Sequence, residues 1–150
     1  VTPTLCYGIQ WDATLAFIGD ENYNKNSTKK GNYNNNAWTI TRETAKYTTS
    51  PNSDTTWTSI SAEENKTKTK TASESILLTT GASEKFKTKN IYDLAGNVFE
   101  WTNEACSANR DIRGGKYDDL GTNVPASCRY SYGPYFEFNY LGFRLALYIK

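Results

Sequence analysis

The sequence predicts a single α+β domain with one helix near its start, several short strands in its last third and long surface loops. Apolar residues recur at helical spacing between residues 8 and 19, whereas the apolar runs after residue 97 are short and follow turn residues. This order favours an α+β fold over alternating strand and helix units. A chain of 150 residues is long enough to bury one core. Residues 1–150 are therefore expected to form one domain.

The predicted helix covers residues 8–19. Trp11, Leu15 and Ile18 lie at positions i, i+4 and i+7, which places them on one helical face. Gly19 stands where a helix commonly ends in the left-handed conformation. The tryptophan of this helix, like Trp101 in a later strand, is expected to anchor the core.

The middle of the chain, residues 20–89, is rich in Asn, Thr, Lys and Ser and predicts mainly surface loops. Its extremes are the asparagines at 34–36 and the alternating Lys and Thr of 66–70, which predict a solvated strand or loop. Two apolar islands, 37–41 and 75–81, are expected to pack onto the core. Because seventy residues without structure would be unusual in a compact domain, short helices or strands must lie in this stretch.

The last third predicts strands at 98–102, after a Gly-Asn turn, and at 111–113, before Gly114 and Gly115. Residues 142–150 alternate in polarity and predict one half-buried strand with Phe143, Leu145 and Leu147 on its apolar face, together with Ile149. The segment between residues 115 and 142 shows neither helical nor strand periodicity and predicts long irregular surface loops.

The composition excludes several classes of function. Seventeen basic and sixteen acidic residues leave a net charge of +1, which implies neither nucleic acid nor an anionic membrane as a partner. The chain has no histidine, so His-based triads and His-ligated metals are excluded. No apolar run approaches the roughly 20 residues of a membrane span, so direct membrane insertion is not expected.

The three cysteines, Cys6, Cys106 and Cys128, lie far apart without a Cys-x-x-Cys spacing, which excludes a zinc knuckle or a thioredoxin-type motif. They allow at most one disulfide, between Cys6 and Cys106, and an accessible thiol at Cys128. The start of the chain has neither Met nor a signal-peptide pattern, so the sequence is expected to be the C-terminal part of a longer protein.

Three segments carry a resemblance to a known family: residues 7–13, residues 91–102, and residues 113–115 with 142–144. They resemble the formylglycine-generating-enzyme-like, or sulfatase-modifying-factor, version of the C-type lectin fold. The Gly-Asn-Val-Phe-Glu-Trp run at 96–101 is the most specific of them. The resemblance implies a small antiparallel sheet with flanking helices and long loops on one side.

The catalytic members of this family hold copper with two cysteines, one about four residues after the Gly-Gly pair and one beside a Tyr-Arg-Tyr-like run. In this sequence the first place is taken by Asp118 or Asp119, and only Cys128 is near the second. One soft ligand cannot replace two. The domain is therefore expected not to be an enzyme, and a metal-dependent oxidase remains the alternative.

Residues 113–150 also resemble the C-terminal variable region of proteins diversified by retroelements. Misreading of adenines in AAC-type codons yields a limited set of residues, which excludes Lys and Glu, so Lys116 and Glu137 would be fixed. The positions that this set reaches are Tyr117, Asp118, Asp119, Leu120, Thr122, Asn123, Cys128, Tyr130, Ser131, Tyr132, Gly133, Phe136, Phe138, Asn139 and Tyr140.

The same residues suit recognition, because Tyr supplies rigid contact area at low entropic cost while Ser, Gly and Asn adapt hydrogen bonds. The loops at 117–140 are therefore predicted to bind an unidentified protein or glycan on a cell surface. The domain itself is expected on the surface of a virion or of a bacterial cell. Two alternatives are an adhesive domain of fixed specificity, and a core role for Phe136 and Phe138 with the tyrosines as a cap.

The family resemblance further implies a structural calcium site at Asp93, Gly96, Val98 and Glu100, with two carboxylates and two backbone carbonyls as hard oxygen ligands. In the alternative interpretation, Asp93 caps backbone amides of a turn and Glu100 pairs with an arginine.

Overall fold

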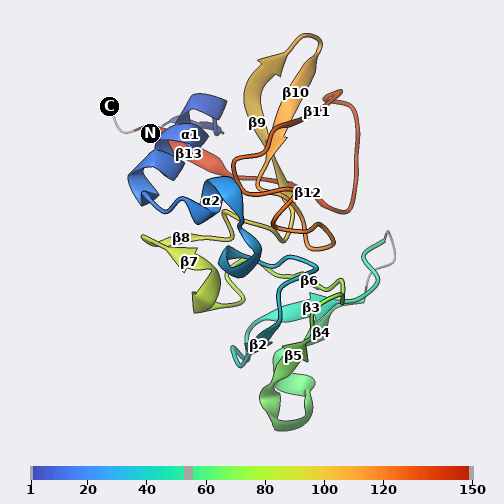
Figure 1. Ribbon diagram of the computed structural model, residues 1–150. Helices are drawn as coiled ribbons and strands as arrows, with labels where there is room; N and C mark the ends of the chain where they lie inside the picture. Colours follow the sequence, from blue (N-terminus) through green and yellow to red (C-terminus); the bar gives the residue numbers. More distant parts are fainter. Residues whose placement is uncertain (1, 53–55, 149–150) are drawn as a thin grey trace.

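The computed structural model describes residues 2–52 and 56–148. Short strands dominate it, and two α-helices lie near the start of the chain (Figure 1). The α-helices are α1 (Gly8–Ile18) and α2 (Asn22–Lys25), and the 3₁₀ turns are η1 (Thr28–Lys30), η2 (Ile60–Ala62), η3 (Glu64–Lys66) and η4 (Glu84–Phe86). The strands are β1 (Thr2–Leu5), β2 (Trp38–Ile40), β3 (Lys46–Thr48), β4 (Thr58–Ser59), β5 (Lys68–Lys70), β6 (Leu77–Leu78), β7 (Lys87–Thr88), β8 (Ile91–Tyr92), β9 (Phe99–Cys106), β10 (Asn109–Arg113), β11 (Tyr130–Tyr132), β12 (Leu141–Phe143) and β13 (Leu145–Tyr148).

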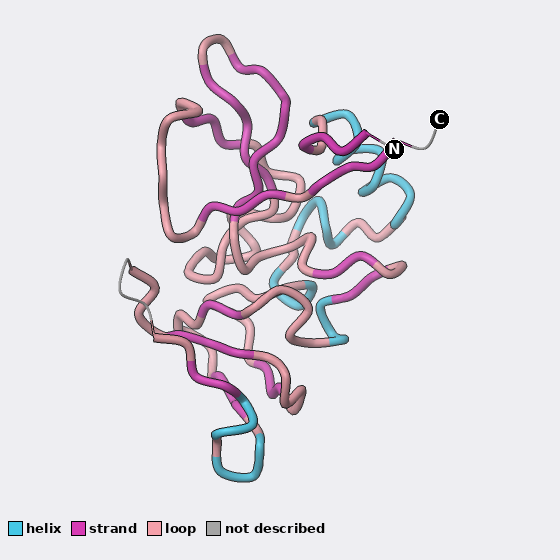
Figure 2. The backbone as a smooth tube through the Cα atoms, turned by 180° about the vertical axis from the view of Figure 1, so that it is seen from behind, coloured by secondary structure: helices cyan, strands magenta, loops and turns pink. Residues whose placement is uncertain are grey.

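The chain forms two lobes, an upper lobe built on the longest strands and a lower lobe built on β2–β6 (Figures 1 and 2). The upper sheet has the order β11-β10-β9-β12, and a separate ribbon pairs β1 with β13. The predicted antiparallel sheet is confirmed except at one edge, where β12 runs parallel to β9. Within the described ranges, no helix is long and apolar enough to cross a bilayer.

Helix α1 confirms the prediction from spacing. Trp11, Leu15 and Ile18 are buried, and Gly19 ends the helix in the left-handed conformation with φ of 68°. The Trp11 indole nitrogen donates a hydrogen bond of 2.9 Å to the carbonyl of Ala126. The helix is thereby fastened to the loop that leads into β11.

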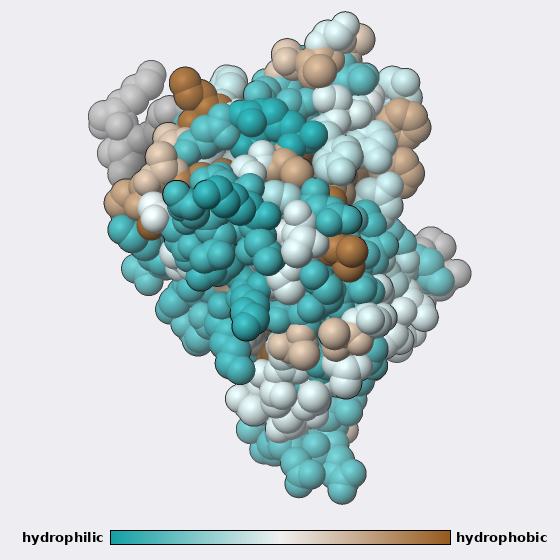
Figure 3. All heavy atoms as spheres, viewed as in Figure 1, coloured by the Kyte–Doolittle hydropathy of each residue, from teal (hydrophilic) through white to brown (hydrophobic). Residues whose placement is uncertain are grey.

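The lower lobe contains strands β2–β6 with η2 and η3, which are the largest group of the short elements expected within residues 20–89; α2, η1, η4 and β7 also fall in this stretch. Its strands are two or three residues long, and they enclose a small core of their own. The large apolar residues of both islands are buried, with Trp38 and Ile40 on β2 and Ile76, Leu77 and Leu78 around β6. All of these except Leu77 belong to the core of the lower lobe, not to the core around Trp11 onto which they were predicted to pack. Figure 3 shows that the outer tip of this lobe is hydrophilic.

The prediction of a solvated segment at 66–70 is wrong at Lys70, whose side chain is buried. Its ammonium donates to the carbonyls of Tyr33, Asn34 and Asn36 at 2.9, 2.9 and 2.6 Å. Burial lowers the pKa of this lysine. The Lys-Thr segment at 66–70 is therefore bound to the asparagine-rich segment at 34–36, because the Lys70 ammonium donates hydrogen bonds to backbone carbonyls there.

The two lobes meet at the Gly-Asn turn of the family motif. The Asn97 side chain accepts from the backbone N–H of Leu78 and donates to its carbonyl, both at 3.0 Å, and it also accepts from the Asn32 amide. Gly96 has φ of 69°, and a Cβ there would lie 2.5 Å from the carbonyl oxygen of Asn32. This close approach explains why glycine and asparagine stand together in the motif.

The C-terminal alternation predicted the wrong buried face. Residues 141–148 form two strands, and the side chain of Arg144 between them turns inward to Glu100. Phe143, Leu145 and Leu147 are instead 65%, 55% and 64% exposed. The Arg144 side chain points inward because it forms a charge-assisted pair with the buried Glu100 carboxylate. Since successive side chains of an extended chain point to opposite sides, its neighbours Phe143 and Leu145 point outward. Ile149 lies outside the described residues.

Candidate ligand-binding surface

The candidate surface begins at β11, an edge strand of the upper sheet. Tyr130 and Tyr132 lie opposite Ile112 and Arg110 of β10. Because strand residues two apart share a face, both tyrosines project from the same side. The Tyr130 ring packs edge-on against Phe99, with centroids 5.6 Å apart. The predicted irregular segment between 115 and 142 therefore contains a strand that positions its tyrosines.

Beyond β11, four rings form a continuous stack, which we name the aromatic row: Tyr135, Phe136, Phe138 and Tyr140. Centroids of successive rings are 4.8, 5.7 and 4.9 Å apart, and the last two pairs are nearly parallel, at 10° and 7°. Tyr132 meets Phe136 and Phe138 edge-on at 6.1 and 5.7 Å. The rings thus support one another, and Tyr132 and Tyr140 also pack against the buried cluster of Phe99, Ile112 and Val124.

Three of the four rings in the aromatic row are exposed, whereas Tyr140 is half-buried. Tyr135 is 80% exposed, and Phe136, Phe138 and Tyr130 remain about 40% exposed. The alternative in which Phe136 and Phe138 fill the core is therefore wrong. Tyr135 was not among the predicted variable positions, although its residue type belongs to the reachable set, so the same codon signal identifies it.

The loop before β11 divides the predicted positions into two groups. Asp118, Leu120, Thr122 and Asn123 are exposed. Tyr117 is buried, and burial raises its pKa to about 12, so its prediction as a ligand-binding residue is wrong. Codon composition carries no information about burial, so it does not distinguish the buried Tyr117 from the exposed positions.

Asp119 and Gly133 also have structural roles. The Asp119 carboxylate accepts the backbone N–H of Lys116 at 3.1 Å, and its side chain is only partly exposed. Gly133 is buried, and a Cβ there would lie 2.7 Å from the Tyr135 ring. The prediction of Gly133 as a ligand-contacting position is therefore wrong. Ser131 and Asn139 are exposed, and the Asn139 amide donates to the carbonyl of Pro51 in the lower lobe.

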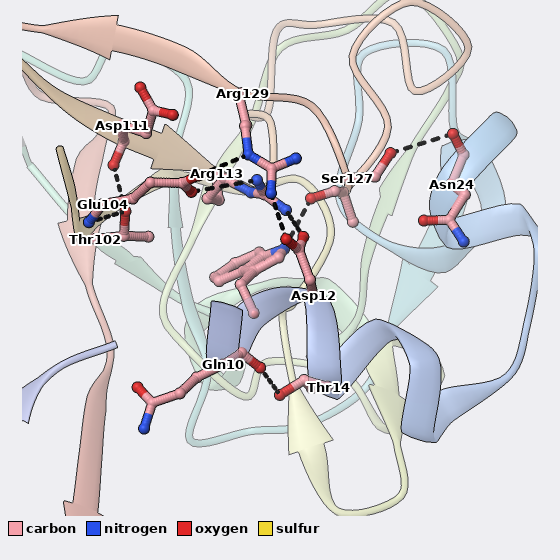
Figure 4. A network of polar contacts seen from close by, with 12 residues as sticks. Gln10, Asp12, Thr14, Asn24, Thr102, Glu104, Asp111, Arg113, Ser127 and Arg129 are labelled. Atoms are coloured by element: carbon pink, nitrogen blue, oxygen red, sulfur yellow. Dashed lines mark hydrogen bonds and ion pairs between the residues drawn. The ribbon is translucent and has the colours of Figure 1, made fainter. Parts of the chain in front are cut away.

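A charged network lies beneath the start of β11 and consists of Asp12, Glu104, Arg113 and Arg129 (Figure 4). Arg113 is fully buried, and its Nη2 donates to an Asp12 oxygen at 2.6 Å, while its Nη1 lies 3.7 Å from Glu104. Arg129 donates to the other Asp12 oxygen and, at 3.0 Å, to Glu104. Helix α1, β9, β10 and the residue before β11 are thereby joined through two shared carboxylates.

Three of the four residues predicted to bind calcium, Asp93, Val98 and Glu100, line one pocket, but three of the four carboxylate oxygens of Asp93 and Glu100 already accept hydrogen bonds. Both Glu100 oxygens accept from Arg144 at 2.7 Å, and an Asp93 oxygen accepts the N–H of Gly81 at 2.6 Å. Val98 lines this pocket, and Gly96 forms the lobe junction. Burial raises the pKa of both carboxyl groups, and Arg144 opposes the rise. A guanidinium beside both carboxyls repels a cation, so this donor set fits calcium poorly and fits the arginine alternative well.

The three cysteines do not pair. Cys6 is buried, Cys106 is exposed, and Cys128 is half-buried with its thiol directed at the Asn123 carbonyl. Burial raises the pKa of Cys128, which makes its thiol less reactive than the accessible thiol predicted. Among the described residues, no group of three Cys, Asp or Glu side chains is arranged to hold a metal ion.

Trp101, which lies near Pro134 at the start of the loop after β11, is only partly buried. With Leu5, Arg110 and Pro134 it lines a pocket of about 280 Å³, so its prediction as a core anchor holds only in part. Trp11, by contrast, is buried as predicted.

A mixed sheet flanked by one long helix, with long loops gathered at one side, defines a C-type-lectin-like domain of the α+β class. The family model described as "Sulfatase-modifying factor enzyme 1-like domain" matches residues 17–149, and the chain belongs to this family. The predicted fold and family are confirmed.

Among solved structures, Treponema denticola variable protein 1 is similar, with a TM-score of 0.54 and 18% sequence identity. The similarity covers 95% of this chain and 46% of that chain, so this chain spans less than half the length of its structural neighbour. At this identity the likeness concerns the fold. No curated protein matches the sequence.

Proposed function

We propose that this domain is a non-catalytic ligand-binding module whose aromatic row and neighbouring exposed residues form a diversified recognition surface. The aromatic row carries the proposal. Three of its four rings, Tyr135, Phe136 and Phe138, remain exposed in a loop and lie outside the buried core clusters, while Tyr140 is half-buried and anchors the row against the cluster around Phe99. Exposed aromatic clusters on a rigid scaffold are typical of binding sites, because they bury large area at low entropic cost.

The distribution of fixed and reachable positions supports diversification. Lys116, which adenine misreading cannot produce, pairs with Asp118 and Asp119, and its ammonium lies 5.1 Å from the centre of the Tyr140 ring. Arg129 belongs to the charged network below. Lys116 thus supports the loop, whereas Glu137, the other position that adenine misreading cannot produce, is exposed. The name of the structural neighbour, a variable protein, agrees with this proposal.

The oxidase alternative lacks a second thiol. Cys128 is the one cysteine in the loops, and the first family position is occupied by Asp118 or Asp119. Cys6 lies at the foot of α1, where its thiol is directed to the Tyr7 carbonyl. The partner would be a protein or glycan on a cell surface, and the domain would act at a virion or bacterial surface.

Sequencing the DNA that flanks the coding region tests diversification directly. A near-copy of the codons for residues 117–140 is expected near a reverse-transcriptase gene, with mismatches confined to adenines of the copy. A flanking sequence without either feature would favour an adhesive domain of fixed specificity.

A display library tests the recognition surface itself. Randomising Tyr130, Tyr135 and Phe136 should leave most clones folded and should yield binders to an immobilised test protein. A matched library at the buried positions Ile40, Ile60 and Ile112 should leave few clones folded. Equal loss of folding in both libraries would contradict the proposal, as would copper-dependent oxidation of a cysteine-containing peptide by the purified domain.

A further inference from the structure

The faces of the rings in the aromatic row are mostly covered by one another. Phe136 and Tyr140 both stack on Phe138, but they do not contact each other among the described ring pairs, which places them on opposite faces of Phe138. The Tyr135 ring packs against Phe136. At the far end, the ammonium of Lys116 lies over Tyr140. Among the ring and cation contacts of the described residues, Tyr135 alone in the row has a single partner, and because it is 80% exposed it keeps an open ring face.

The exposed area of Phe136 and Phe138 must then belong mainly to their edges. An aromatic ring has a negative face and a positive edge, so a row of edges presents an apolar surface with a weak positive character. Its natural complements are the faces of other aromatic rings, aliphatic groups and carbonyl oxygens. A sugar ring, by contrast, binds aromatic side chains by laying its C–H groups on an open face.

We infer that the aromatic row engages a protein partner, through ring edges that contact aromatic and apolar side chains, rather than a glycan. The inference rests on the proposed function and specifies its partner. Edge-to-face contacts with a partner's rings would continue the geometry already present between Tyr132 and Phe138. Rigid aromatic anchors of this kind dominate protein interfaces.

Saturation-transfer NMR with two small probes tests this inference. N-acetyl-tryptophanamide represents an aromatic protein side chain, and methyl β-galactopyranoside represents a glycan. The amide is expected to receive saturation from the row, and the glycoside is not. Phe138→Ser, which interrupts the row, should lower the amide signal by about tenfold, whereas Tyr135→Ser, which removes the open face, should lower it much less.

Unfolding curves check that each variant is folded, and Phe138→Leu replaces Phe138→Ser if the serine variant does not fold. Loss of the amide signal in Phe138→Leu supports edge recognition, because leucine keeps apolar volume but has no ring. Glycoside transfer that is equal to the amide signal and depends on Phe138 would overturn the inference and indicate a glycan ligand. Absence of both signals would also overturn it, while the display library would still decide whether the surface binds ligands at all.

Discussion

The substitution Asp12→Asn would remove a negative charge from the charged network while preserving side-chain size. Asp12 accepts hydrogen bonds from Arg113 and Arg129, and the side chain of Arg113 has no exposed area. Among the described residues, Nε and Nη1 of Arg113 find no hydrogen-bond partner. Without Asp12, Arg113 would depend on Glu104 alone, at 3.7 Å, and Glu104 would also have to neutralise Arg129.

The magnitude follows from burial. Breaking one partner of a fully buried ion pair costs about 3–5 kcal/mol. The Asp12 side chain is 45% exposed, so water screens part of its charge, and we expect a loss of about 2 kcal/mol in the free energy of unfolding. For a domain of this length, this loss corresponds to a decrease of roughly 4–8 °C in Tm.

Urea and thermal unfolding monitored by tryptophan fluorescence would measure this change. The matched control is Glu21→Gln, which breaks the pair with Lys25, whose two side chains are 74% and 78% exposed. The control should lose at most about 0.5 kcal/mol. If Asp12→Asn were no less stable than the control, Asp12 would not be the main counter-charge of Arg113.

Three further outcomes are expected. Tyr117→Ser should destabilise the fold by about 3 kcal/mol because the ring is buried, whereas Tyr130→Ser should cost less than about 1 kcal/mol in the same urea titration; equal costs would contradict the division of the loop. Chelation should leave Tm unchanged because Arg144 occupies both oxygens of Glu100, and a lower Tm that added calcium restores would establish a calcium site. A hydrogen bond from a lysine lowers the pKa of Asp20 to about 2, so its contribution is present above the unfolded pKa near 4 and is lost as pH falls towards 2. Asp20→Asn should therefore reduce Tm slightly at neutral pH and match the wild type at pH 2, and a gap of constant size would refute this assignment.

Local sequence patterns predicted the elements that local physics determines. The spacing of Trp11, Leu15 and Ile18 identified α1, and Gly19 identified its end, because a helix closes its hydrogen bonds within its own residues. Strands β9 and β10 followed from turn residues and short apolar runs, although both are longer than predicted. The lower lobe could not be placed, because strands of two or three residues exist only through partners far away in the sequence.

The errors arose where a polar group is buried for a specific partner. Alternation assigned Arg144 to the solvent face and Phe143 to the core, but the carboxylate of Glu100 reverses this order. The sequence likewise predicts Lys70 in solvent, because its hydrogen-bond partners are backbone carbonyls, which composition does not reveal. In the candidate site, residue types identified the aromatic loop, while only the structure separates exposed positions from the buried Tyr117.

The pairing of β1 with β13 makes the domain suitable for grafting into other proteins. Thr2 lies opposite Tyr148, and antiparallel partners have Cα atoms about 5 Å apart, so the chain enters and leaves the fold at one place. That place lies on the opposite side of the molecule from the loop after β11 (Figure 1). A host protein could receive residues 2–148 within a single surface loop, through two short linkers. The aromatic row would then face away from the host protein and remain accessible to solvent.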